Sequence, residues 1–156
     1  MKTAEQIRQH LDALPEPKRR DLEELHGTIL ELMPGCKLWF LDGRDESGKV
    51  VSNPSIGYGS RAMESARGKS REFYQVGISA NTAGISVYIF GFRDKSDLLR
   101  SFGERLGKAK VSGYCVKARK IADLNLDALR EAIRHAIESA ADAGTNRIEE
   151  AGETTS

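Results

Sequence analysis

Cysteine, proline and histidine are scarce in this 156-residue chain, which has two, four and three of them respectively. Cys36 and Cys115 lie far apart in the sequence, with neither a CxxC pair nor the spacing of a metal site. We therefore expect two reduced, unpaired thiols and no disulfide framework, as is usual for a cytoplasmic protein.

A dominant charge and a long apolar run are also missing. The 24 basic and 23 acidic side chains leave a formal net charge of +1. Nucleic-acid-binding domains usually carry an excess of Lys and Arg, because counterion release supplies much of their affinity. No segment approaches the roughly 18 apolar residues that a transmembrane helix needs, and the polar N-terminus does not resemble a secretory signal. We expect neither a nucleic-acid partner nor a membrane partner.

Helical periodicity is present at both ends of the chain. Apolar side chains recur every three to four residues over 3–14 and 17–32, with charged side chains between them. The same spacing predicts a third helix over 98–106, with Gly107 as its C-cap, and a last helix that Asn125 caps.

Alternating apolar and polar residues between these helices predict strands. We expect a hairpin of 36–41 and 49–52 around a polar turn at 42–48, and a second hairpin of 72–79 and 84–91. Short strands are also predicted at 55–59 and 111–117. Residues 61–70 are charged and small, which favours a loop, with a short helix as the alternative.

This order of elements predicts an α+β fold, a two-layer sandwich with helices on one face of an antiparallel sheet of about five to six strands. We expect a single domain over residues 1–140. Residues 141–156 are predicted to be a disordered acidic tail, because they lack apolar periodicity.

The predicted sheet has a second face, which the helices leave uncovered. We expect the helices to cover Ile85, Val87 and Ile89 on one strand, and Tyr74, Val76 and Ile78 on its neighbour. The opposite face then carries Phe73, Tyr88 and Phe90, with Trp39 or Tyr58 beside them. An exposed aromatic face of this kind predicts a site for a ligand or a second subunit, unless the segments at 42–48 and 61–70 fold over it. Trp39, Tyr58 and Tyr88 are the ligand-binding candidates.

Basic side chains gather near the last predicted strand. Between Arg93 and Lys120, nine basic residues face three acidic ones. Such a patch can hold an anionic ligand or an acidic partner, or it can simply keep an edge strand soluble. Lys117 joins the ligand-binding candidates on this ground.

Several apolar and glycine motifs appear in a familiar order: SIGYG at 55–59, ISVYIFG at 85–91, GYCVK at 113–117 and IADLNLDAL at 121–129. They resemble the YdhG-like family, also called domain-of-unknown-function family 1801, over about residues 16–138. The resemblance implies a compact α/β sandwich. Because some members of the family are described as frataxin-like iron chaperones, it also implies iron as a candidate ligand.

Iron would need converging oxygen donors, or histidine together with carboxylates. The sequence offers one group in the turn, Asp42, Asp45 and Glu46, and another on the second helix, Asp21, Glu24 and His26. The alternative for both groups is a solvated turn and a solvated helix face.

We find no catalytic constellation in the sequence. No GxSxG motif is present, and the segments at 57–59 and 103–108 lack residues that a dinucleotide or phosphate loop requires. We therefore expect a non-enzymatic module that binds a small ligand or iron. The alternative is a protein-interaction module or homodimer that uses the open sheet face or the basic edge at 108–120.

Removal of residues 142–156 should leave the melting temperature almost unchanged, because a polar, aperiodic segment buries little apolar surface. Calorimetry on the full and shortened chains measures this directly. A loss of several degrees would mean that the tail packs against the domain.

Overall fold

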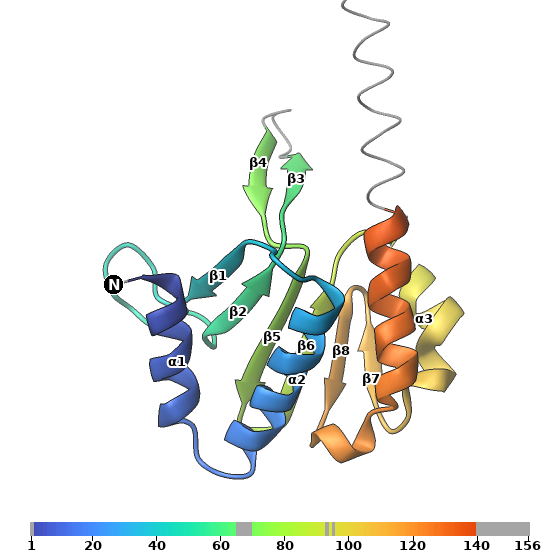
Figure 1. Ribbon diagram of the computed structural model, residues 1–156, viewed down its shortest axis with the longest axis horizontal. Helices are drawn as coiled ribbons and strands as arrows, with labels where there is room; N and C mark the ends of the chain where they lie inside the picture. Colours follow the sequence, from blue (N-terminus) through green and yellow to red (C-terminus); the bar gives the residue numbers. More distant parts are fainter. Residues whose placement is uncertain (1, 65–69, 93, 95, 140–156) are drawn as a thin grey trace, which may run out of the picture.

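The computed structural model describes residues 2–64, 70–92, 94 and 96–139 of the chain (Figure 1). The predicted tail at 141–156 lies outside the described residues. The helices are α1 (Thr3–Ala13), α2 (Lys18–Leu32) and α3 (Asp97–Phe102), followed by a C-terminal helix at 126–139. The strands are β1 (Leu38–Leu41), β2 (Ser55–Tyr58), β3 (Arg61–Glu64), β4 (Ser70–Phe73), β5 (Val76–Asn81), β6 (Gly84–Ile89), β7 (Lys110–Ser112) and β8 (Cys115–Ala118).

Six of these strands form one sheet in the order β1-β2-β5-β6-β8-β7, and every neighbouring pair is antiparallel. α1, α2 and the C-terminal helix lie on the same side of this sheet (Figure 1). The predicted α+β sandwich is therefore confirmed. We call the side that faces the helices the inner face, and the opposite side the outer face.

The core lies between the helices and the inner face. Aliphatic side chains at every second position of β5 and β6 point into it, in contact with the apolar stripes of α1 and α2. Among the largest fully buried side chains are Leu11, Leu22, Leu25, Ile29, Ile56, Ile78, Ile85 and Leu129. The cap of the last helix is also confirmed, because the Asn125 side chain accepts a hydrogen bond from the Ala128 amide at 3.1 Å.

The hairpin predicted from 36–41 and 49–52 is wrong. β1 pairs with β2 instead, with Trp39 opposite Gly57, and residues 42–54 form the connection. A single bridge joins Arg44 and Val50. The Gly43 carbonyl accepts hydrogen bonds from the amides of Val51 and Ser52, which closes this connection on itself.

Residues 61–70 were expected to be a loop or a short helix, and this expectation is wrong for 61–64 and 70, which form strands, while 65–69 lie outside the described residues. β3 and β4 form a separate two-stranded antiparallel sheet, with Arg61 opposite Phe73. This hairpin projects beyond the end of the main sheet (Figure 1). Its short strands alternate too few apolar residues to be recognised by pattern.

The strand expected at 72–79 is broken at Gln75. The Gln75 side chain is buried on the inner side, where its Nε2 donates to the Ala136 carbonyl at 3.3 Å. Val76 also faces the core, so two successive residues point to the same side, as in a β-bulge. The slip turns Tyr74 to the outer face, which corrects the prediction that Tyr74 faces the helices.

The strand expected at 111–117 is instead a tight hairpin of β7 and β8. Gly113 lies in its turn with φ +58°, a conformation that glycine adopts without strain. The helix expected over 98–106 consists of α3 and a short 3₁₀ turn at Gly103–Leu106.

Two histidines lie partly buried in the helical layer. His26 on α2 holds its Nδ1 2.7 Å from the hydroxyl of Tyr58, a residue with no exposed surface. His10 on α1 packs against the Phe40 ring, and its buried Nε2 has no hydrogen-bond partner within the described part of the chain. Burial lowers the pKa of both histidines below 6.5, and nearby Arg8 lowers that of His26 further.

The domain should therefore lose stability as the pH falls below about 6.5. In this range the unfolded chain binds protons that the folded chain resists, so the free energy of unfolding decreases with decreasing pH. Thermal melts between pH 7.5 and 5.5 measure the effect. His10→Leu removes one of the two groups and should make the melting temperature less sensitive to acid; an unchanged pH dependence in this variant would contradict the assignment.

Candidate functional site on the outer face

The centre of the outer face is a pair of glycines on neighbouring strands. Gly57 of β2 and Gly77 of β5 lie directly opposite each other. The Tyr74 ring lies on both of them, because a Cβ added at Gly57 or Gly77 would come within 2.4 or 2.5 Å of that ring. Tyr74 is thereby buried on a face that carries no helix in the described part of the chain.

Four aromatic rings extend from this centre in a row across the sheet. Phe73 stacks on Tyr74 with the ring centroids 4.1 Å apart. Trp39 of β1 lies 6.0 Å from Phe73, Phe90 lies 6.3 Å from Phe73 on the other side, and Tyr114 lies 5.6 Å beyond Phe90. We call Trp39, Phe73, Phe90 and Tyr114 the aromatic row. These four side chains are half-buried, so each ring keeps some surface in contact with solvent.

Three rings of the aromatic row each have a cation over them. Lys37 Nζ is 4.4 Å from the Trp39 ring, and the guanidinium of Arg71 is 5.7 Å from the Phe73 ring. The guanidinium of Arg61 is 5.4 Å from the Phe90 ring. Cation–π contacts of this kind hold each guanidinium plane against its ring.

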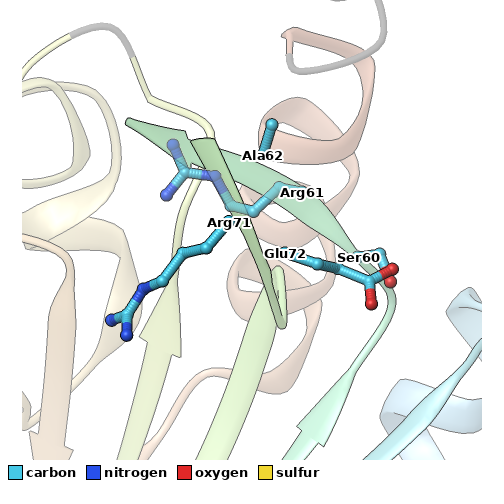
Figure 2. A pocket seen from close by; sticks show the side chains of 5 residues that line it. All are labelled: Ser60, Arg61, Ala62, Arg71 and Glu72. Carbon is cyan, nitrogen blue, oxygen red and sulfur yellow. The ribbon is translucent and has the colours of Figure 1, made fainter. Parts of the chain in front are cut away.

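Beside the two arginines lies a surface hollow of about 350 Å³, lined by Ser60, Arg61, Ala62, Arg71 and Glu72 (Figure 2). Arg61 and Arg71 extend to one side of the β3–β4 hairpin, while Ser60 and Glu72 lie on the other (Figure 2). Glu72 pairs with Lys37 at 2.6 Å, and the resulting hydrogen bond lowers its pKa. The hollow therefore has a cationic side and a neutralised side.

A small polar cluster lies next to the aromatic row. Ser86 of β6 accepts a hydrogen bond from the Asn81 side-chain amide at 3.3 Å and is almost completely buried. Burial raises the pKa of Tyr88 and of the Cys115 thiol, although the Ser86 hydroxyl acts in the opposite direction on both. Lys117, two residues on from Cys115, also opposes the rise in the pKa of the thiol. A thiol with a raised pKa is a poor nucleophile, so Cys115 has a structural role here.

The structure brings two of the four ligand-binding candidates to the centre of the outer face and two elsewhere. Trp39 belongs to the aromatic row, and Tyr88 lies opposite both Gly77 and Cys115. Lys117 lies on the same face at its far end, directly opposite Lys110. Tyr58 directly follows Gly57 in β2 and therefore points to the opposite, inner side. There it lies in the core and is hydrogen-bonded to His26.

Sequence reasoning missed the arginines of this site. Arg61 was assigned to a loop, and Arg71 was passed over. Both arginines lie on the same side of the hairpin as Phe73. Arg71 precedes Phe73 by two residues on β4, and Arg61 is the cross-strand partner of Phe73. The sequence signal was RxFY at 71–74, which is recognisable only once β3 is known to pair with β4.

The metal candidates do not converge in the structure. The Asp45 carboxylate accepts three hydrogen bonds, from the Ser47 amide and hydroxyl and from the Lys49 amide, which lower its pKa. Asp42 accepts from the Arg44 amide, and Glu46 is exposed. Throughout the described residues, no group of three or more His, Cys, Asp or Glu side chains is arranged to hold a metal ion.

The candidates on the second helix point to different partners. The buried carboxylate of Asp21 accepts a hydrogen bond from the Ile121 amide at 3.1 Å. His26 contacts Tyr58, whereas Glu24 is exposed. These three residues therefore do not converge on one site, and Asp21 fixes the loop before the C-terminal helix to α2.

Comparison with known proteins does not extend this description. No family model, curated protein or solved structure matches the chain. Among the described helices, none has the length and apolar character to cross a membrane.

Substitution of Gly77 by Ala should destabilise the domain by about 1–3 kcal/mol, because the new methyl group would displace the Tyr74 ring. Gly27→Ala is the matched control. It adds the same methyl group to α2, where nothing lies within 4 Å, and should stabilise the helix by roughly 0.5–1 kcal/mol. Urea denaturation separates the two; a neutral Gly77→Ala would show that Tyr74 can leave the glycine pair without cost.

Proposed function

We propose that this chain is a non-enzymatic binding module that holds a small organic anion with a flat ring on the outer face of its sheet. The observation that carries the proposal is the pair of guanidinium groups, Arg61 over Phe90 and Arg71 over Phe73, beside the hollow. The module would use the aromatic row for contact area and the arginines for recognition of charge.

Two features of the hollow support a small ligand. Its volume of about 350 Å³ lies within the usual range of about 300–1,000 Å³ for small-molecule sites. Carboxylates and phosphates accept two parallel hydrogen bonds from one guanidinium, and a guanidinium plane also stacks on a flat ring.

The lining favours recognition over chemistry. Ser60, Arg61, Ala62, Arg71 and Glu72 include neither histidine nor cysteine, and the one carboxylate is paired with Lys37. General acid–base catalysis needs a group whose proton is readily exchanged near neutral pH. Among the residues that line the hollow, no side chain has this property.

Iron, which the YdhG-like resemblance suggests, fits the described residues less well than an organic anion. The Asp45 carboxylate already accepts hydrogen bonds from its own turn, and the candidate carboxylates and His26 are distributed over separate sites. Iron-chaperone activity therefore stays a prediction from the resemblance alone.

A second candidate function is docking of an acidic protein segment, and one observation favours it. Lys110 and Lys117 are direct cross-strand partners at the end of the outer face. Like charges in such positions repel, and an acidic side chain from a partner would relieve this repulsion. The cytoplasm is the compartment that we propose for either function, since both cysteines are free thiols.

Benzoate and phenyl phosphate should quench or shift the fluorescence of Trp39, whereas neutral benzamide should not. Trp39 is the sequence's only tryptophan and lies 6.0 Å from Phe73, so it reports on this face alone. Arg71→Gln should weaken anion binding by about tenfold, the loss expected for one charged hydrogen-bonding group.

Arg20→Gln is the matched control for this titration. It removes the same charge from α2, on the other side of the sheet, where the side chain is 79% exposed. Binding should then be unchanged. Equal responses to the three probes, or equal losses in the two variants, would contradict an anion site at Arg71.

A further inference from the structure

The two edges of the six-stranded sheet are protected differently. β7 forms one edge, where Lys110 and its cross-strand partner Lys117 place two positive charges beside any approaching strand. β1 forms the other edge with the sequence LWFL, which contains no charge. Within the described part of the chain, no strand pairs with the free edge of β1.

The backbone of β1 presents unpaired groups at this edge. The Gly59 amide donates to the Lys37 carbonyl at 2.8 Å, which places Lys37 in a hydrogen-bonded pair of the β1–β2 ladder. Hydrogen-bonded positions alternate along an antiparallel ladder. Trp39 and Leu41 therefore bond to β2, and the amide and carbonyl groups of Leu38 and Phe40 point away from the sheet.

Exposed apolar side chains lie at the end of β1 and in the connection that follows it. Among the large apolar side chains of the described residues, four are exposed: Leu41, Val50, Val51 and Leu99. The first three, 37%, 59% and 62% exposed, belong to β1 and to the connection that follows it. The bridge between Arg44 and Val50 folds this connection back toward the end of β1. Unpaired backbone with adjacent apolar surface is the usual setting for strand addition.

We propose that a second copy of this chain docks here, with β1 of one protomer antiparallel to β1 of its partner around a twofold axis at Trp39. In this register Leu38 of one protomer lies opposite Phe40 of the other, so every outward backbone group of β1 gains a partner. Lys37 lies opposite uncharged Leu41, and no like charges meet. β7 carries Lys110 at its edge with Lys117 beside it, and these charges disfavour the addition of a strand, which is why we assign self-association to β1.

This inference goes beyond the proposed function, because it rests on the backbone of β1 and not on the two arginines of the hollow. Two four-residue strands and a few valines bury less than the 1,200–2,000 Å² of a standard interface. We therefore expect a dimer with a dissociation constant in the micromolar range, visible by light scattering as the concentration is raised.

The test compares the scattering mass of three proteins from micromolar to millimolar concentration. The natural chain should pass from monomer to dimer, and Leu41→Lys combined with Val51→Lys should stay monomeric. Leu99→Lys, which changes the exposed apolar side chain on α3, should dimerise like the natural chain. Amide exchange of the natural chain supplies an independent readout, since the Leu38 and Phe40 amides should become protected only in the dimer.

A natural chain that stays monomeric at millimolar concentration would overturn the proposal. So would a dimer that survives the two lysine substitutions, or one in which the Leu38 and Phe40 amides exchange as rapidly as in the monomer. Dissociation caused by Leu99→Lys would place the interface on α3 instead.

Discussion

The contact between the Tyr74 ring and the glycine pair Gly57 and Gly77 organises the outer side of this domain. Because the glycine on each of these two adjacent strands lacks a Cβ atom, the sheet has a depression there, and the ring fills it. Phe73 then stacks on Tyr74 and separates Trp39 from Phe90. Since Phe73 ends β4, the same contact anchors the β3–β4 hairpin and hence both arginines of the hollow. A side chain at either glycine would disturb this whole arrangement.

The two faces of the sheet are stabilised by different forces. The inner face is aliphatic and buried under helices, so its contribution scales with apolar area removed from water. The outer face combines ring stacking with cation–π contacts, each worth about 0.5–2 kcal/mol. The cation–π contacts thus hold these cations in fixed orientations, which in the proposed function would lower the entropy cost of binding an anion.

Much of the inner layer could be predicted from sequence, and little of the outer layer could. Leu22, Leu25 and Ile29 repeat at helical spacing, and Ile85, Val87 and Ile89 alternate, because burial on one side imposes these periods. The slip at Gln75 leaves no such trace: a buried polar residue follows a tyrosine, and the alternation still looks continuous. The extra residue at the bulge turns Tyr74 to the opposite face, so Tyr74 was assigned to the wrong side.

The residues of the candidate site were also only partly predictable from the sequence. Trp39 and Tyr88 could be placed on the outer face by alternation alone, whereas the role of Tyr58 depends on its contact with His26 across the core. Arg61 and Arg71 gain their meaning from a strand pairing outside the main sheet. These two short strands show little apolar alternation, so their pairing depends on tertiary contacts such as the stacking of Phe73 on Tyr74.

Gln75 links the bulge to the helical layer. Its neighbour Tyr74 lies on the outer face, while its own side-chain amide crosses to the helical side and donates to the Ala136 carbonyl of the C-terminal helix. The peptide between Tyr74 and Gln75 therefore joins the two layers of the domain, because the residue before it packs on the glycine pair and the residue after it is hydrogen-bonded to a helix.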